Sequence, residues 1–215
     1  MRNLIAIFIT LFLSHNLSSQ TNIKNNFEIC DSDFQFYLKK RYSKDIIDHI
    51  KFNKDSSFSY YSDYFIGENI KVNYRNSDSL KIVPYQYVLS YDILDVNDDV
   101  ITSFSINCRC YDNLLRMDKI EDFDEILKPE IEVITGNALT LNEAFNLAKK
   151  RGYSITQWNL DYEKKKGSNE YKKIFPKLVW TLKEKLPKGK GGYYKVLQIN
   201  ARNGRVMNEY QEYGL

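Results

Sequence analysis

The clearest alternation of hydrophobic and polar positions lies in residues 138–215. Apolar residues recur at helical spacing near its start, where Thr140 and Glu143 form a T-x-x-E capping box that predicts the beginning of a helix. Four runs rich in alternating apolar residues follow and predict strands, and Asn203-Gly204 predicts a hairpin turn between the last two. These strand-like runs cover 154–162, 178–185, 193–200 and 205–213.

The preceding region shows a similar series of patterns. Apolar residues recur near helical spacing over 34–51, where a break at Ser43 into two pieces is an alternative. The polar residues 20–32 before them are expected to form a flexible lead-in. Four strands are predicted next, and a short acidic turn at 95–99 joins the last two as a hairpin. These strands cover 58–65, 69–74, 82–94 and 100–110.

Residues 112–137 are expected to connect the two regions. The apolar positions within 114–127 fit a short acidic helix, and Pro129 is expected to end it. A short strand over 130–135 is predicted to follow.

Together these patterns predict an α+β fold in which a helix packs on an antiparallel sheet, in αββββ order. The same order in residues 20–137 and 138–215 suggests two tandem copies of one unit. The two hairpins also match locally, because Asn97 and Asn203 coincide when the turns are aligned. The alternative is that any two hairpins can be aligned in this way.

The N-terminus has the layout of a secretory signal peptide. Arg2 precedes the apolar run 4–13, and small residues suited to cleavage lie within 17–20. That run is about half of the roughly 20 residues that span a bilayer, which weakens the alternative of a membrane anchor. We therefore expect residues 1–19 to be removed and the mature chain to be secreted or periplasmic, without a transmembrane segment.

The net charge of +3 conceals an asymmetry. Residues 138–215 hold 16 Lys/Arg and 7 Asp/Glu, a net +9, whereas residues 1–137 hold 15 and 21, a net −6. A basic half attracts acidic partners such as anionic lipid, polysaccharide or nucleic acid. The simpler interpretation is that the lysine runs solvate a loop, and we do not expect nucleic acid to be the partner.

The chain contains three cysteines, and export favours disulfide formation. Cys108 and Cys110 are two residues apart on a predicted strand, where a bond between them would strain the extended backbone. A bond from Cys30 to Cys108 or Cys110 is the expected pairing, which leaves the other cysteine free or linked to another molecule. Three reduced, buried cysteines are the alternative. A zinc site would need a fourth ligand at suitable spacing, and the sequence shows none.

The sequence contains no recognisable motif for catalysis or cofactor binding. Residues 95–99 open like a calcium loop, but Val100 and Ile106 stand where such a loop needs a glycine and a bidentate glutamate. An acidic hairpin tip is therefore expected there. The single histidine of the mature chain, His49, has no nucleophile motif to accompany it. We expect no catalytic residue, no metal and no cofactor.

Aromatic residues are the main excess, with 17 tyrosines and 12 phenylalanines. Tyrosines on strands either fill a core or form an exposed recognition surface, since binding surfaces are enriched in tyrosine. The candidates for such a surface are Tyr85, Tyr87, Tyr91, Tyr193 and Tyr194.

The segments ALTLNEAFNLAKKRGY, LVWTLK and YYKVLQINARNGRVMNEYQEY resemble a PepSY-type domain. That family shows a helix with regularly spaced alanines, an aromatic-bearing strand and a terminal hairpin whose turn reads Asp-x-x-x-Gly-x-Val. The matching positions are Ala144, Ala148, Trp180 and 200–206, with Asn200 in place of the usual aspartate. The match covers about a third of the chain, and residues 20–137 resemble the family more weakly. The resemblance implies a small secreted module that binds or inhibits other proteins, sometimes as the pro-region of a peptidase.

The sequence thus predicts a secreted, non-enzymatic binding or inhibitory module that acts through a sheet face, with another secreted or envelope protein as its candidate partner. Two alternatives stay open. One is a secreted hydrolase whose carboxylates the sequence does not identify. The other is an envelope protein that binds an anionic polymer through its basic C-terminal half. The ligand and the oligomeric state are not specified by the sequence.

Overall fold

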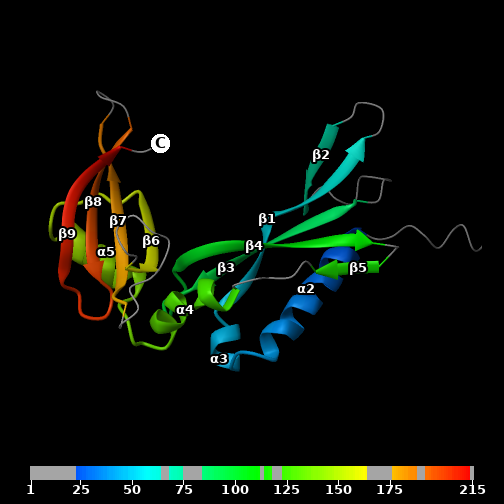
Figure 1. The fold of residues 1–215 in the computed structure, drawn as a ribbon, viewed down its shortest axis with the longest axis horizontal. Helices are drawn as coiled ribbons and strands as arrows, with labels where there is room; N and C mark the ends of the chain where they lie inside the picture. The colour runs from blue at the N-terminus through cyan, green and yellow to red at the C-terminus, as the bar shows by residue number, and fades with distance from the viewer. Residues whose placement is uncertain are drawn as a thin grey trace, which may run out of the picture. The chain divides into compact units, whose positions relative to one another are not determined.

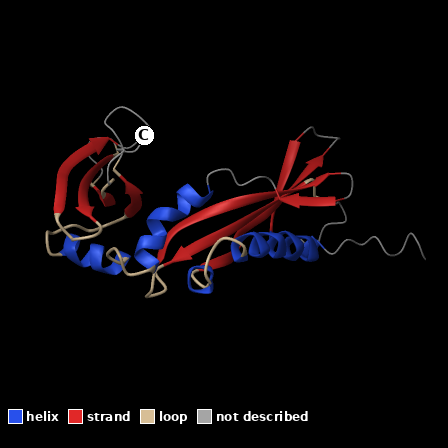
Figure 2. Cartoon of the chain, turned by 60° about the horizontal axis from the view of Figure 1, so that its bottom comes forward, coloured by secondary structure: helices blue, strands red, loops and turns tan. Residues whose placement is uncertain are grey.

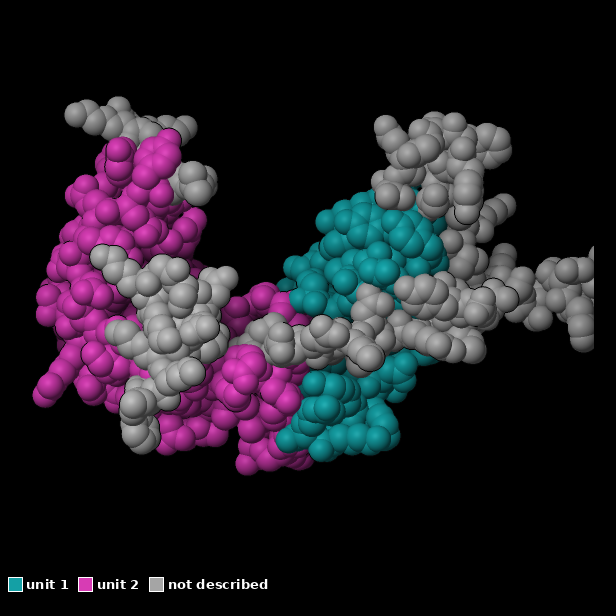
Figure 3. All heavy atoms as spheres, viewed as in Figure 1, with its two compact units in different colours: residues 1–41, 52–90, 105–119 teal, residues 42–51, 91–104, 120–215 magenta. Residues whose placement is uncertain are grey.

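The computed structural model describes residues 23–63, 68–74, 84–111, 114–117, 123–163, 176–187 and 192–213. The predicted signal peptide and most of the lysine-rich insertion after residue 163 lie outside these residues. The chain forms two compact units (Figure 3). Unit 1 comprises Met1–Arg41, Phe52–Ser90 and Ser105–Lys119, and unit 2 comprises Tyr42–Lys51, Tyr91–Phe104 and Ile120–Leu215. Unit 2 therefore contains the predicted C-terminal domain, 138–215, together with segments from earlier in the chain.

The protein belongs to the α+β class, as the sequence predicts. Its described helices are α2 (Ile23–Lys39), α3 (Lys44–Ile47), α4 (Phe123–Ile134) and α5 (Leu141–Lys149). A five-stranded sheet has the order β2-β1-β3-β4-β5, and a four-stranded antiparallel sheet has the order β6-β7-β8-β9 (Figure 1). Within the described ranges, no helix is long and apolar enough to cross a membrane. The strands are β1 (Ile50–Asp63), β2 (Glu68–Asn73), β3 (Gln86–Leu94), β4 (Val100–Tyr111), β5 (Leu114–Met117), β6 (Gln157–Tyr162), β7 (Leu178–Lys185), β8 (Tyr193–Asn200) and β9 (Val206–Tyr213).

Helix α2 supplies a buried stripe to the core of unit 1, where it lies along the sheet (Figure 2). Phe27 and Phe34 are fully buried and seven residues apart, which places them on one face of the helix. The Phe27 ring packs edge-on against Tyr74 and Tyr87, with centroid separations of 5.0 Å in both cases. The expected flexible lead-in at 20–32 is therefore wrong over the described residues, because a core helix begins at residue 23.

The predicted helix over 34–51 is also wrong in its second half. Helix α2 ends at Lys39, Ser43 is the N-cap of the four-residue helix α3, and β1 begins at Ile50. Burial along β1 then alternates with a period of two, which an extended strand satisfies and a helix does not. The buried positions that show this period are Ser57, Ser59 and Tyr61.

The helix predicted within 114–127 and the strand predicted over 130–135 are largely exchanged in the structure. Residues 114–117 form strand β5, which pairs antiparallel with β4, and the predicted strand over 130–135 belongs mostly to helix α4. Helix α4 runs through Pro129, although a proline inside a helix costs about 3 kcal/mol. Burial of large apolar side chains, at about 1.5–3 kcal/mol each, outweighs that cost. These buried side chains are Phe123, Leu127, Val133 and Ile134.

Helix α5 covers one face of the four-stranded sheet in unit 2. Trp180, on the neighbouring strand β7, is fully buried, and its indole Nε1 donates a hydrogen bond to the Leu139 carbonyl at 2.9 Å. Ala144 and Ala148 are also fully buried, so the helix presents small side chains to its surroundings. This packing assigns one face of the sheet to the core of unit 2.

The local signals that bound these C-terminal elements are confirmed. The Glu143 backbone N–H donates to the Thr140 hydroxyl, and the Glu143 carboxylate accepts from the Thr140 backbone N–H at 2.8 Å, so the predicted capping box is present. Gly204 has a φ of +71°, the left-handed value that the predicted hairpin turn requires. A side chain at this position would approach Leu147 Cδ1 to 3.3 Å.

Candidate binding groove

The sheet face opposite α5 carries a groove with a volume of about 880 Å³. Successive side chains of a strand point to opposite faces, so Val179 and Thr181 face away from the side on which Trp180 is buried. The register continues this division across the sheet, since Trp180 is aligned with Leu160 on β6 and Ile199 on β8. The polar side chains that line the groove include Asn159, Asp161, Thr181, Gln198, Asn208 and Tyr210.

A row of polar side chains crosses all four strands at the floor of this groove. In register, Asn159 lies opposite Thr181, Thr181 opposite Gln198, and Gln198 opposite Asn208. The Gln198 amide donates to the Thr181 hydroxyl at 3.5 Å, and the Asn208 amide donates to the Gln198 carbonyl oxygen at 2.7 Å. The Asn159 amide forms no hydrogen bond with the side chains or backbone of the described residues. Hydrogen bonds therefore hold the Gln198 and Asn208 amides in place, and the row leaves hydrogen-bonding capacity toward the groove.

The charges on this sheet face are largely compensated. Lys183 forms an ion pair with Glu212, which lies on β9. Tyr210 is 40% exposed, and its pKa is raised by burial and by the charge of Glu212. Asp161 and Glu163 are the acidic residues that line the groove. The groove thus presents mainly neutral polar groups, with a carboxylate side at its β6 end.

A smaller hollow of about 380 Å³ lies beside the groove and shares Glu163, Met207 and Asn208 with it. Lys177 and Arg205 line this hollow together with Asn203 from the β8–β9 turn. Its basic side chains distinguish it from the larger groove.

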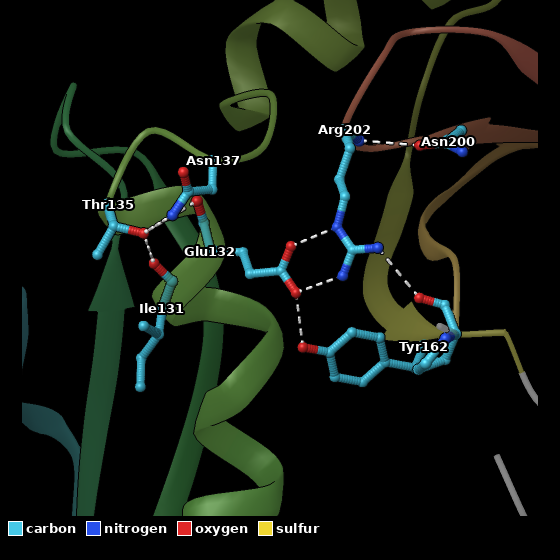
Figure 4. Close-up of polar contacts among 8 residues, drawn as sticks. Ile131, Glu132, Thr135, Asn137, Tyr162, Asn200 and Arg202 are labelled. Atoms are coloured by element: carbon cyan, nitrogen blue, oxygen red, sulfur yellow. Dashed lines mark hydrogen bonds and ion pairs between the residues drawn. The ribbon is translucent and has the colours of Figure 1, made fainter. Parts of the chain in front are cut away.

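A polar cluster ties helix α4 to the end of the sheet (Figure 4). The Arg202 guanidinium donates to both oxygens of the Glu132 carboxylate, at 2.6 and 2.7 Å, and the Tyr162 hydroxyl donates to the same carboxylate at 2.7 Å. Arg202 also donates to the Pro176 carbonyl at 3.2 Å. The hydrogen bonds from Arg202 lower the pKa of Glu132, and burial together with Glu132 raises the pKa of Tyr162. Since Tyr162 also lines the groove, this cluster fixes the groove at its β6 end.

Glu130 lies two residues before Glu132 on α4 and has a contrasting environment. It is 4% exposed, and its Oε2 atom has no hydrogen-bond partner among the residues that the structure describes. Burial, with a further contribution from the charge of Asp161, raises the pKa of Glu130 to about 8. Burial therefore favours the neutral form of this side chain, which is not among the groove-lining residues.

The structure separates the five tyrosines that the sequence groups as a candidate surface. Tyr87 and Tyr91 are fully buried, so these two belong to the core and not to a binding surface. Tyr87 and Tyr91 alternate with other residues along β3, together with Leu89 and Ile93, and the face that these four define points inward. Tyr85 and Tyr193 are 39% and 42% exposed, and they belong to different units. Tyr194 is half-buried and accepts a hydrogen bond from Gln157 at 3.3 Å.

Cys30 and Cys108 form a disulfide with an S–S distance of 2.08 Å, one of the two pairings that the sequence leaves open. Both cysteines are fully buried in unit 1, where the bond links helix α2 to strand β4. The side chain of Cys110 lies outside the described residues. The disulfide thus joins two segments of unit 1 and closes a loop of 78 residues that also includes Tyr42–Lys51 and Tyr91–Phe104 of unit 2.

In the acidic turn at 95–99, the first carboxylate, that of Asp95, has a structural role. Asp95 is fully buried, and its carboxylate accepts backbone N–H groups of Asn97, Asp99 and Leu141 at 2.8–3.1 Å. His49 lies nearby, with its Nδ1 atom 3.2 Å from the Asp95 carbonyl oxygen. The part of the chain that the structure describes has no group of His, Cys, Asp or Glu that could hold a metal ion. Asp95 therefore joins the hairpin turn to the first turn of α5.

The groove residues carry no motif that marks them in the sequence. Their signal is the alternation on β7, because the residues between Leu178, Trp180 and Leu182 must face away from the core. The alignment of Asn159, Thr181, Gln198 and Asn208 depends on strand register, which no local pattern specifies.

In comparisons with known proteins, no protein-family model, no curated protein and no solved structure matches this chain.

Proposed function

We propose that this protein is a secreted, non-enzymatic binding module that acts through the sheet face opposite α5. The groove on that face carries the proposal, because its volume of about 880 Å³ falls within the roughly 300–1,000 Å³ typical of ligand sites. Its polar side chains come from all four strands, so a rigid sheet positions them. A preformed site of this kind lowers the entropic cost of binding.

A PepSY-like architecture for residues 138–215 forms part of this proposal. Helix α5 precedes four strands that are adjacent in chain order, and Ala144, Ala148 and Trp180 are fully buried. These observations support a structural role for the shared motif, which leaves binding to the opposite face. The proposal includes a second, diverged copy within residues 20–137.

Export of the mature chain is also proposed, on the pattern of residues 1–19. The Cys30–Cys108 disulfide supports it, because disulfides persist mainly in oxidising compartments such as the periplasm and the extracellular space. A secreted or envelope component is accordingly the expected partner.

The position of Glu130 favours binding over hydrolysis. A general acid needs a raised pKa and contact with the substrate. Glu130 is the described carboxyl group whose pKa is raised, yet it is buried on α4 and does not line the groove. The described residues that line the groove also include no cation that would attract an anionic polymer.

A blocking variant tests the proposal. Thr181 lies at the groove floor, so Thr181→Arg would fill the groove with a long side chain, whereas Ser154→Arg changes an exposed position before β6. Immobilised mature protein and both variants would be incubated with envelope and extracellular fractions of the source cells, after circular dichroism shows that each is folded. Components held by the unmodified protein and by Ser154→Arg should be lost from Thr181→Arg. Equal capture by all three proteins would refute a role for the groove.

A further inference from the structure

The chemistry of the groove narrows the class of ligand, and this inference rests on the proposed function of the same face. We propose that the groove binds a neutral, hydroxyl-rich ligand, namely a short oligosaccharide. The observation behind it is a row of side-chain amides and hydroxyls that crosses the sheet beside an exposed tyrosine.

Amide side chains match the hydrogen-bonding pattern of sugar hydroxyls. Each carboxamide offers two donor hydrogens and an acceptor oxygen, and each sugar hydroxyl both donates and accepts. Asn159 has its full capacity available, since it forms no hydrogen bond to the described residues around it. Gln198 and Asn208 are held by hydrogen bonds to neighbouring strands and retain further donors and acceptors. The row can therefore pair with several hydroxyl groups at once.

Tyr210 and Asp161 complete the site at its two ends. Tyr210 lies on β9 and is 40% exposed, so part of its ring surface can cover the apolar face of a sugar ring. Asp161 lies on β6 and lines the opposite end, where a carboxylate accepts hydrogen bonds from hydroxyl donors. The ligand would then run across the strands, from β6 to β9.

Charge and polarity disfavour other small ligands. The described residues that line the larger groove include no cation for a phosphate or a carboxylate. Lys183, further along the same strand as Thr181, is paired with Glu212. Apolar ligands prefer sites lined mainly by hydrophobic side chains, whereas the floor of this groove is a row of three amides and one hydroxyl. An extended peptide would need apolar pockets for its anchoring side chains. Val179 lines the groove but is only 6% exposed, so it offers little apolar surface to such an anchor.

The test measures binding of defined neutral oligosaccharides. Isothermal titration of the folded mature protein would use cellohexaose, maltohexaose, xylohexaose and chitohexaose, with hexagalacturonate as the anionic counterpart. At least one neutral hexaose should bind, and Asn159→Ala combined with Asn208→Ala should weaken that binding at least tenfold. Asn142→Ala combined with Asn146→Ala is the matched control, because these two asparagines are exposed on α5 and bond to each other. This control should bind like the unmodified protein.

Tyr210 provides a second, independent variant. Tyr210→Phe should keep most of the affinity for the neutral hexaose, whereas Tyr210→Ala should lose it by about tenfold, because the ring and not the hydroxyl makes the contact. Absence of binding to all four neutral probes, or equal binding by the groove variant, would overturn the inference. Exclusive binding of hexagalacturonate would also overturn it. If Thr181→Arg still abolishes capture of a cellular component while no hexaose binds, the groove is a binding site for a different ligand. Release of shorter sugars during the titration would instead refute the non-enzymatic function.

Discussion

Replacement of Glu130 by glutamine should remove most of the alkaline sensitivity of unit 2. The carboxyl group is 4% exposed, and burial raises its pKa from 4.5 to about 8. An acid with a raised pKa in the folded state binds its proton more tightly when folded than when unfolded. The contribution of the protonated Glu130 carboxyl group to the free energy of unfolding is therefore fully present below the unfolded pKa, near 4.5. It is lost as the pH rises toward 8.

The size of this effect follows from the two pKa values. A tenfold change in acidity is worth about 1.4 kcal/mol, so the interval from 4.5 to about 8 corresponds to roughly 5 kcal/mol in the free energy of unfolding. Glutamine has nearly the same shape as the protonated acid and carries no proton that titrates. Glu130→Gln should therefore be more stable than the unmodified protein by several kcal/mol at pH 8.

Urea unfolding between pH 5 and pH 9, followed by far-ultraviolet circular dichroism, measures the difference. The free energy of unfolding of the unmodified protein should fall with pH up to about 8, while that of Glu130→Gln should change much less. Glu125→Gln is the matched control, since Glu125 lies on the same helix, is exposed and pairs with Lys128. It should keep the pH dependence of the unmodified protein. Parallel curves for the unmodified protein and Glu130→Gln would refute the assignment of a buried, protonated carboxyl group.

Three further substitutions test other contacts. Replacing both Cys30 and Cys108 by alanine should lower the free energy of unfolding by roughly 4 kcal/mol, because the bond spans 78 residues. The urea midpoint of this variant should not respond to dithiothreitol, and a midpoint equal to that of the oxidised unmodified protein would contradict the prediction. The pair between Glu132 and Arg202 should show a coupling energy of about 1 kcal/mol in a double-mutant cycle of Glu132→Gln and Arg202→Met at pH 7. Because Arg202 lowers the pKa of Glu132, that coupling is present above about pH 4.5 and is lost as the pH falls below it, so a coupling that persists at pH 3 would argue against the pair. Asp95→Ala leaves three backbone N–H groups without their acceptor and should cost about 3 kcal/mol or more in urea unfolding, and a cost under about 1 kcal/mol would show that water replaces the carboxylate.

The C-terminal elements could be predicted from sequence because their signals are local. Strands β7 and β8 begin and end where the alternation does, and the capping box of Thr140 with Glu143 marks the start of α5. Each signal depends on residues within one turn or one strand, so tertiary contacts reinforce it without being needed to detect it.

The errors lie where tertiary burial overrides a local rule. Pro129 is a strong local reason to end a helix, yet α4 continues because its apolar side chains enter the core of unit 2. The segment before residue 32 is polar in composition, yet Phe27 and Cys30 are fully buried and hold α2 in the fold. Composition averages over a segment and cannot report two buried positions within it.

The candidate site could be predicted only in part for a related reason. Alternation on β7 identifies two faces, but it does not say which polar residues of other strands lie beside Thr181. That neighbourhood depends on the register of β6, β8 and β9, which includes an irregularity between Gln198 and Ile199. The assignment of Tyr87 and Tyr91 to a binding surface is wrong for the same reason. They alternate along the strand as surface residues would, and only their burial shows that they belong to the core.

The placement of the two tryptophans gives the protein an internal reporter. The chain has two tryptophans, Trp158 and Trp180, and both lie in unit 2, one partly exposed and one fully buried. Tryptophan emission therefore originates in unit 2, whereas the described disulfide lies in unit 1. Reduction of the disulfide perturbs unit 1 chemically while fluorescence follows unit 2 optically. A shift of the fluorescence transition on reduction would show that the stability of unit 2 depends on the cross-link, and an unchanged transition would show that unit 2 unfolds independently of it.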